Sequence, residues 1–160
     1  MSGKLSAGLL MYRLAGGQVE VLLAHPGGPY FRNKDDGAWT LPKGEVEPDE
    51  EPARCALREF REETGIDPGS APLLALGEIK QRGGKRVQAW AFAGEWDGVG
   101  APPSNSFELE WPPRSGKRVS FPEIDRMAFF ALLEARTKIL PAQAELLDRL
   151  ERALAGSGEE

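Results

Sequence analysis

Cysteine and histidine are nearly absent from this chain: each occurs once among 160 residues. A single cysteine excludes an internal disulfide framework. Cys55 adjoins Ala56 in a helix-period pattern with no Cys/His pairing around it, so we expect a small buried or half-buried thiol rather than a nucleophile. His25 ends an apolar segment, where it is either a structural imidazole with satisfied hydrogen bonds or an acid or base that faces a substrate.

An excess of positive charge is also missing, because 20 Lys and Arg stand against 25 Asp and Glu, for a net charge of -5. A protein that binds duplex nucleic acid ordinarily carries a basic face, so we expect no nucleic-acid partner. The N-terminal apolar run, residues 5–12, is much too short to span a bilayer and lacks a cleavage-site pattern. We therefore expect no membrane association and a location in the cytoplasm.

The length suits one domain with its own core, over residues 1–155. Residues 94–104 are rich in glycine and proline, and we interpret them as a surface loop because too little chain follows to form a second core. The last residues, 156–160, have no apolar side chain to bury and are expected to form a flexible tail.

Alternating or apolar segments bounded by turn residues predict strands. Residues 6–12 and 18–24 predict one hairpin, and residues 73–81 and 86–93 predict another. The basic turn of the second hairpin serves either to bind phosphates or to keep the surface soluble. The remaining predicted elements are a strand at 105–111, a short helix at 131–138 and a closing helix after Pro141.

The most informative stretch covers residues 44–66. Asp49 is a good N-cap, Pro52 suits the first turn, and nothing interrupts a helix before Gly65. We therefore predict a helix over residues 50–64, whose apolar positions recur at steps of three and four and would face a core.

Three glutamates, Glu59, Glu62 and Glu63, fall together on another side of this helix. One interpretation is a charged, solvated face, because like charges four residues apart cost a helix only about 0.2–0.5 kcal/mol. The other is a metal site, because hard oxygen ligands that converge are what Mg²⁺ or Mn²⁺ requires.

The same stretch resembles the box motif of the Nudix family at every defining position. The matching residues are Gly44, Glu50, Arg58, Glu59, Phe60, Glu62, Glu63, Gly65 and Ile66. The resemblance implies an α/β (α+β) fold, the Nudix-type α/β/α sandwich with a mixed central β-sheet. It also implies an enzyme that uses Mg²⁺, or Mn²⁺, to cleave the diphosphate of a nucleoside diphosphate joined to another group, by attack of water.

The resemblance also implies a role for each box residue. The expected metal ligands are Glu59, Glu62 and Glu63, the expected catalytic residues are Glu59, Arg58 and Glu62, and the structural residues are Gly44, Glu50 and Gly65. Glu59 is able to serve as both ligand and base. Arg58 would orient Glu59, and Glu50 would hold Arg58 or the loop. A backbone carbonyl at Lys43 or Gly44 is a further expected ligand.

The segment before the box reads Trp39-x-x-Pro42-Lys43-Gly44, which resembles Nudix branches that cleave dinucleoside polyphosphates and diphosphoinositol polyphosphates. A dinucleoside polyphosphate or a related polyphosphate is therefore the expected substrate, and Lys43 binds it unless this lysine turns away from the site. The alternatives are a nucleoside triphosphate pyrophosphohydrolase and a non-catalytic nucleotide-binding domain. The resemblance is also compatible with a homodimer.

Residues outside the box are further candidates for substrate binding. Trp39, with Tyr30 and Phe31, either stacks on a base or pins the preceding loop to the core. Arg114 and Lys117 lie in a loop between strand-like segments and are candidates for substrate binding, of which we select Arg114.

Glu123 lies outside the box, in a segment that resembles the Nudix strand and short helix near the end of the domain. We expect it to supply an additional metal ligand or a base from across the site. Its rivals for this role are Glu108, Glu110 and Asp125.

Overall fold

The structure is a computed structural model that describes residues 4–98 and 102–158. Its strands are β1 (Leu5–Ala15), β2 (Gln18–Pro26), β3 (Lys43–Glu45), β4 (Leu74–Lys80), β5 (Arg86–Ala93), β6 (Ser106–Glu110), β7 (Arg118–Pro122) and β8 (Ile124–Ala131). Its helices are α1 (Pro52–Thr64), α2 (Leu132–Lys138) and α3 (Ala144–Gly158), with short 3-10 turns η1 (Arg82–Gly84) and η2 (Pro141–Gln143). The strands and helices expected from the sequence are all present.

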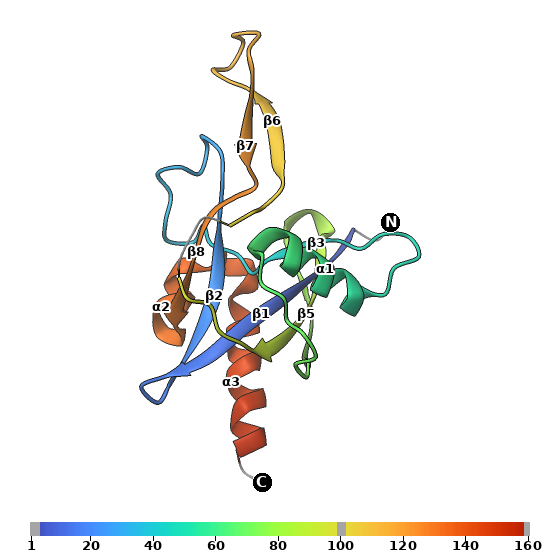
Figure 1. Cartoon of the computed structure of the whole chain (residues 1–160), viewed down its shortest axis with the longest axis vertical. Helices are drawn as coiled ribbons and strands as arrows, with labels where there is room; N and C mark the ends of the chain where they lie inside the picture. The colour runs from blue at the N-terminus through green and yellow to red at the C-terminus, as the bar shows by residue number, and fades with distance from the viewer. Residues whose placement is uncertain (1–3, 99–101, 159–160) are drawn as a thin grey trace.

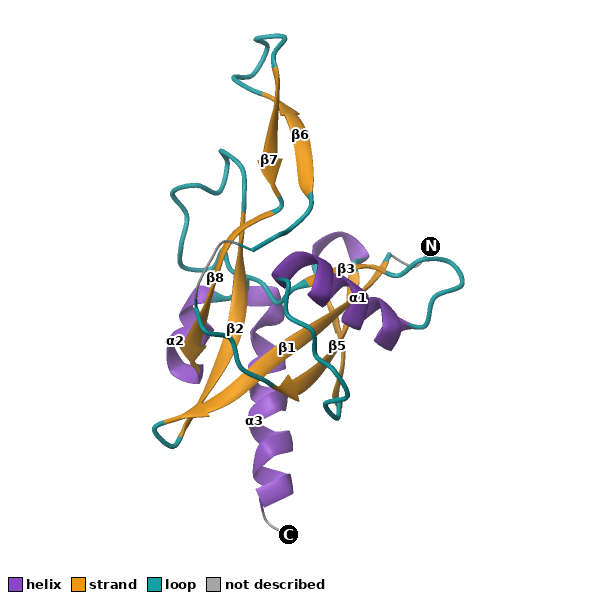
Figure 2. Cartoon of the chain, in the orientation of Figure 1, coloured by secondary structure: helices purple, strands orange, loops and turns teal. Residues whose placement is uncertain are grey.

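A central β-sheet lies between α1 on one face and α2 with α3 on the other (Figure 1). The β6–β7 hairpin stands away from these layers, and α3 ends at the opposite end of the molecule (Figure 2). This arrangement confirms the predicted α/β/α sandwich.

The sheet is mixed. Its strand order is β4-β5-β1-β2-β8, and β3 pairs with β1. β1 and β5 run parallel, whereas the pairs β1–β2, β4–β5 and β2–β8 are antiparallel. The tight turn between β1 and β2 is formed by Gly16 and Gly17, whose φ values of 59° and 80° favour glycine.

The two faces of the sheet bury different residues because side chains alternate along a strand. Leu9 and Met11 of β1 pack with Phe60 of α1, whereas Leu10 packs with Leu146 of α3 on the other face. The apolar face of α1 is thereby fixed on the sheet, which holds the box helix in one orientation.

The predicted start of the box helix was wrong. α1 begins at Pro52, and Glu51 is the N-cap residue without a side-chain hydrogen bond. Residues before it form a turn, in which the N–H of Glu47 donates to the side chain of Glu50 at 3.1 Å and the N–H of Glu50 donates to the carbonyl of Glu47 at 3.0 Å. Asp49 therefore lies in this turn and does not cap the helix.

Helix α3 continues to Gly158, so it includes residues 156–158 of the tail that the sequence predicts to be flexible, and residues 159–160 lie outside the described part of the chain. The flexibility of this tail stays a prediction. The loop expected after Trp111 closes a hairpin, because residues 118–122 form β7 and pair with β6. The surface loop predicted at 94–104 has no helix or strand over its described residues, 94–98 and 102–104.

Within the described ranges, none of the helices has both the length and the apolar character needed to cross a membrane.

Candidate functional site

Helix α1 has a buried face and a charged face. Phe60 and Cys55 are fully buried against the sheet, whereas Glu62 is exposed. Burial and the charge of Glu50 raise the pKa of the Cys55 thiol to about 11. A thiolate nucleophile is therefore disfavoured near neutral pH, and Cys55 is the buried thiol that the sequence predicts.

Arg58 contacts the carboxylates of Glu50, Glu59 and Glu62. Its guanidinium donates two hydrogen bonds to Glu50, from Nε at 2.8 Å and from Nη2 at 2.9 Å, and a third from Nη1 to Glu59 at 2.8 Å. Glu62 Oε2 lies 3.6 Å from Nη1. The hydrogen bonds from Arg58 and from the Glu47 backbone lower the pKa of Glu50 to about 2. The ionised Glu50 holds Arg58, and Arg58 in turn holds Glu59.

Gly44 of β3 lies directly against Glu59. A Cβ atom added at Gly44 would lie 2.1 Å from Cδ of Glu59, so only glycine leaves room for this carboxylate. Gly65 has a φ of 77°, and its N–H donates to the carbonyl of Arg61 at 2.9 Å. Both box glycines thus occupy positions that disfavour a side chain.

Glu63 is buried, and its Oε2 has no hydrogen-bond partner. Burial, followed by the charges of Glu59 and Glu123, raises the pKa of Glu63 to about 8. Burial also raises the pKa of Glu59, partly offset by Arg58. A buried carboxylate oxygen without a donor, beside other carboxylates, is suited to a cation.

Glu123 lies between β7 and β8. Its charge raises the pKa of both Glu59 and Glu63, so the three carboxylates are close enough to repel one another. The structure thus brings Glu123 together with the box residues, although they are far apart in the sequence.

The three rivals of Glu123 have partners elsewhere. Glu108 pairs with Arg118 at 3.1 Å, and Glu110 accepts hydrogen bonds from the backbone of the hairpin tip. Asp125 Oδ1 lies 2.9 Å from His25 Nδ1. The charge of Glu123, by contrast, contributes to the raised pKa of Glu59 and of Glu63.

The chemistry of these donors fits a hard divalent cation, since they are carboxylate oxygens and one of them is buried without a partner. In their present positions, no three acidic, histidine or cysteine side chains in the described part of the chain converge closely enough to hold an ion. Arg58 contacts two of these carboxylates, Glu59 at 2.8 Å and Glu62 at 3.6 Å.

Lys43, the first residue of β3, lies half-buried beside this cluster. Burial lowers the pKa of its ammonium group, whereas the charges of Glu63 and Glu59 raise it. The cation is therefore at the edge of the acidic cluster, as the sequence predicts, and its contact with a substrate stays a prediction.

Trp39 does not offer a ring face to a ligand, contrary to the prediction that it binds substrate. It is only 5% exposed, and its ring packs edge-on with His25 at 5.1 Å and with Phe130 at 4.9 Å between centroids. Its Nε1 donates a hydrogen bond to Asp35 at 2.8 Å. Trp39 therefore pins the loop before it to the core, which is the alternative that the sequence left open.

His25 is a structural imidazole. It is fully buried, with Nδ1 2.9 Å from Asp125 Oδ1 and Nε2 2.6 Å from the carbonyl oxygen of Lys34. Both ring nitrogens are thus occupied in tying β2 to β8 and to the loop after β2, and neither is free for a substrate.

Arg114 is not brought together with the box. It lies at the tip of the β6–β7 hairpin, with a φ of 64°, and its backbone N–H donates to Glu110 at 3.3 Å. Figure 1 shows this tip far from α1. A direct contact between Arg114 and the diphosphate that the box would cleave is therefore not supported, whereas contact with a distant part of a long substrate remains a prediction.

The sequence reasoning missed Gln143. This fully buried side chain accepts a hydrogen bond from the N–H of Leu41 at 3.1 Å, and its Nε2 donates to Thr40 at 2.8 Å and to Gln81 at 3.1 Å. It thereby fixes the segment that leads to Lys43 and Gly44. The one available signal was a polar residue at the start of an otherwise leucine-faced helix.

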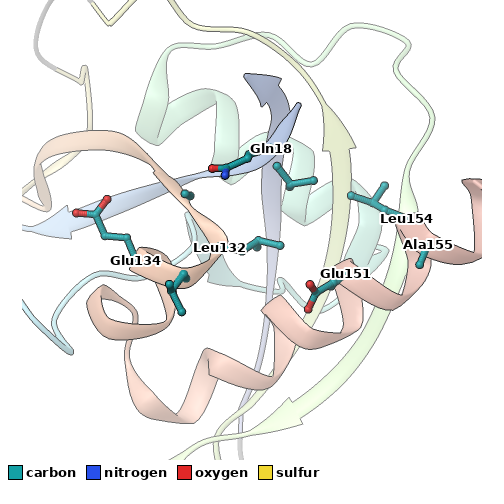
Figure 3. A pocket seen from close by; sticks show the side chains of 9 residues that line it. Gln18, Leu132, Glu134, Glu151, Leu154 and Ala155 are labelled. Atoms are coloured by element: carbon teal, nitrogen blue, oxygen red, sulfur yellow. The ribbon is translucent and has the colours of Figure 1, made fainter. Parts of the chain in front are cut away.

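A separate hollow of about 660 Å³ lies between the start of β2, α2 and the last turns of α3 (Figure 3). Leu132, Leu154 and Gln18 are among the residues around it. No box residue lines it, so it is not part of the carboxylate site.

The NUDIX domain family model matches residues 4–150 of this chain. A protein from Roseobacter denitrificans named RNA pyrophosphohydrolase is 41% identical over 61 residues, which cover 36% of this chain and 38% of that protein. An asymmetrical bis(5'-nucleosyl)-tetraphosphatase from Caenorhabditis elegans is 39% identical over 61 residues, which cover 38% of this chain and 40% of that protein. The matched segments thus span only about two-fifths of each relative.

Similarity to solved structures extends over the whole fold. The crystal structure of a C. elegans Ap4A hydrolase binary complex matches with a TM-score of 0.65 and 24% identity, covering 96% of this chain and 98% of that chain. The family match, the complete box and the sandwich fold agree, and this chain belongs to the Nudix family.

Proposed function

We propose that this protein hydrolyses a diphosphate linkage in a nucleoside diphosphate joined to another group, using Mg²⁺ or Mn²⁺, and that the substrate is a dinucleoside polyphosphate or a related polyphosphate. The observation that carries the proposal is the acidic cluster. Glu63 has a buried oxygen without a partner, and the charges of Glu59 and Glu123 act on it. Such crowding is unfavourable unless a cation is shared among the carboxylates.

In this proposal Glu59, Glu62, Glu63 and Glu123 would hold the ion. When bound, the ion would neutralise phosphate oxygens of the substrate and make the attacking water more acidic. The protein supplies the arrangement of the ligands, because Gly44 leaves room for the Glu59 carboxylate and the core fixes α1 beneath it.

The remaining roles belong to side chains that hold or move a proton. Glu59 accepts the proton of the attacking water, which the raised pKa of its carboxyl favours. Arg58 orients Glu59 through its 2.8 Å hydrogen bond, and Glu50 holds Arg58. Lys43 binds phosphate oxygens of the substrate from the edge of the cluster.

The substrate class is supported by the segment before the box and by the names of the matched relatives. One relative is named for RNA and the other for a bis(5'-nucleosyl) tetraphosphate. Both kinds of substrate therefore belong in the first test. A nucleoside triphosphate pyrophosphohydrolase is distinguished by its products, a free nucleoside monophosphate and pyrophosphate, whereas the same cleavage of RNA leaves a 5'-monophosphorylated chain.

A non-catalytic domain that only binds a nucleotide is the alternative from another class. Such a domain has no need of metal-binding carboxylates, whereas this chain has Glu59, Glu62 and Glu63 together with Glu50 and Arg58. Tight nucleotide binding without turnover would favour that alternative.

The test is product analysis with purified protein and Mg²⁺ or Mn²⁺, across dinucleoside polyphosphates, 5'-triphosphorylated RNA, nucleoside triphosphates, nucleotide sugars and diphosphoinositol polyphosphates. We expect preferential cleavage of a dinucleoside polyphosphate or a related polyphosphate, and a loss of at least about 100-fold in Glu63→Gln, equivalent to ~2.7 kcal/mol of transition-state stabilisation. Absence of turnover on every substrate would contradict the proposal.

A further inference from the structure

The β6–β7 hairpin and the loop after β2 form a surface outside the acidic site. We call this surface the arm and define it as residues 27–34 and 106–122. The hairpin stands away from the central sheet, with the loop beside it (Figure 1). An isolated two-stranded hairpin is at best marginally stable in water, so this hairpin needs support from another segment.

The loop after β2 supports the hairpin by packing on its apolar face. Phe107 pairs with Phe121 and Leu109 with Val119 across the strands. Gly28 packs on Phe107, and a Cβ atom added at this glycine would lie 2.9 Å from the Phe107 ring. The loop and the hairpin are therefore one packed unit.

Aromatic side chains of the arm remain accessible. Tyr30 packs edge-on against Trp111, with 5.4 Å between centroids, and is still 57% exposed. Phe31 beside it is 38% exposed. Exposed rings on a supported loop are suited to stacking with a planar group.

The arm also has cations without acidic partners. Arg32, Lys34, Arg114 and Lys117 are exposed, and none of them pairs with a carboxylate in the described ranges. This is a local excess of positive charge on a chain whose net charge is -5.

The acidic residues of this region are already engaged. Glu108 pairs with Arg118, and Glu110 accepts hydrogen bonds from the N–H groups of Arg114 and Gly116. Just beyond the loop, Asp35 and Asp36 both pair with Lys138. The four free cations are therefore available to an anionic ligand.

The arm joins the acidic site at its base. Glu123 follows β7 directly, and its carbonyl accepts a hydrogen bond from the N–H of Gly27 at 2.9 Å. The segment that enters the hairpin passes the end of α1, where Pro103 packs on Gly65. A substrate that extends from the box would therefore meet the base of the arm.

We propose that the arm binds the nucleotide part of the substrate that lies beyond the cleaved diphosphate, with a base stacked on Tyr30 or Phe31 and phosphates bound by Arg32, Arg114 and Lys117. Aromatic stacking combined with a basic surface is how proteins bind single-stranded nucleotides without base-specific contacts. The inference rests on the proposed function, since it assigns the substrate's distal group. A second nucleoside of a dinucleoside polyphosphate and the first nucleotides of a 5'-phosphorylated RNA share this chemistry.

Direct binding tests the arm independently of catalysis. Metal-free protein is titrated with a fluorescent dinucleoside tetraphosphate and with a short fluorescent 5'-triphosphorylated RNA. We expect Tyr30→Ala and the double variant Arg114→Glu/Lys117→Glu each to raise Kd about 10-fold for at least one of the two ligands. The matched control is Lys80→Glu/Arg152→Glu, which changes the net charge equally on exposed residues of β4 and α3 and is expected to change Kd less than about 2-fold.

Steady-state kinetics then assigns the effect to the distal group. The arm variants should raise KM for the long substrate that binds. The factor of this increase should be about 10-fold larger than the factor for a nucleotide sugar, which lacks a second nucleotide. An effect on only one of the two long substrates identifies that substrate as the source. Unchanged Kd for both ligands, equal effects of the control variant, or equal losses for short and long substrates would overturn the inference. If the wild-type protein cleaves nothing, the proposed function fails, and the binding titration still decides the role of the arm.

Discussion

At the scale of single residues, the site depends on the opposite electrostatic environments of two glutamates. Arg58 and a backbone N–H keep Glu50 ionised, whereas burial and neighbouring carboxylates disfavour the ionised form of Glu63. Glu50 is therefore suited to hold a side chain in place, and Glu63 is suited to bind a cation. The sequence identifies both as box positions but does not reveal this difference, because burial depends on the packing of α1 on the sheet.

The raised pKa of Glu63 makes a prediction about stability. Its pKa is about 8 in the folded protein against an ordinary value of 4.5, so the folded state binds this proton more tightly than the unfolded state. Stability of the metal-free protein therefore falls as pH rises from about 4.5 to about 8. Glu63→Gln removes this loss of stability at high pH. Above pH 8 we expect the Tm of the variant to exceed that of the wild type by at least about 3 °C, corresponding to ~1 kcal/mol. Near pH 5 we expect little difference between the two Tm values.

The measurement is thermal unfolding in a chelator at both pH values. Glu62→Gln, on the exposed side of the same helix, is the control and should show a smaller difference between the two pH values. A Glu63→Gln protein that is no more stable than the wild type above pH 8 would contradict the account of this residue.

Arg58 makes a second prediction, because lysine keeps the charge but cannot reproduce two hydrogen bonds to Glu50 and a third to Glu59. We expect Arg58→Lys to lower kcat at least about 10-fold and to cost ~1–3 kcal/mol of stability. Arg61→Lys is the matched control, since Arg61 makes one exposed contact of 3.3 Å with Asp67. Similar losses in both variants, measured by kinetics and denaturant unfolding, would argue against a positioning role for Arg58.

At the scale of elements, the short strand β3 sets the distance between the sheet and the box carboxylates. It pairs with β1, where Gly8 lies opposite Lys43 and Ala7 opposite Gly44. Glycines at two contact points allow β3 to pack this closely. Gly8 of β1 lies against the backbone of Pro42, and Gly44 of β3 lies against the side chain of Glu59.

These two glycines predict different outcomes for the same substitution. In Gly44→Ala the new methyl group meets the flexible end of Glu59, 2.1 Å from Cδ, so the carboxylate is displaced and activity should fall at least about 10-fold with little change in Tm. In Gly8→Ala the methyl group meets the carbonyl oxygen of Pro42 at 2.7 Å, so stability should fall by ~1–3 kcal/mol. Rates and melting curves of both variants decide this, and an unstable Gly44→Ala with a normal rate per folded molecule would contradict it.

Much of the element order could be predicted from the sequence, because local signals determine it. Gly65 marks the end of α1, and the Gly16-Gly17 turn marks the first hairpin. The N-cap at Asp49 was wrong because the turn from Glu47 to Glu50 uses its own hydrogen bonds and Pro52 begins the helix.

The remaining features depend on contacts between distant parts of the chain. Gln143 bonds to Leu41 and Thr40 about a hundred residues away, and Trp39 is buried by Phe130. The mostly exposed β7 lacks a strong strand pattern and ends in Pro122, so only its pairing with β6 reveals it. No local pattern in the sequence contains this information.

At the scale of the whole molecule, opposite charges are separated between two regions. The acidic cluster lies between α1 and Glu123, and the free cations lie on the arm that begins beside Glu123. A metal ion at the first region and the phosphates of an extended substrate at the second would complement both. On the proposed function, this separation would allow an acidic chain with a net charge of -5 to bind a polyanion.

The proposed role of the box glutamates is to hold an ion that promotes diphosphate hydrolysis. Its most direct test is the rate of dinucleoside tetraphosphate hydrolysis as a function of Mg²⁺ concentration, for the wild type and Glu63→Gln. We predict a saturable dependence on Mg²⁺ in the wild type, no activity in a chelator, and a rate at least about 100-fold lower in the variant at every concentration. Hydrolysis that persists in the chelator, or a variant with the wild-type rate, would contradict the account.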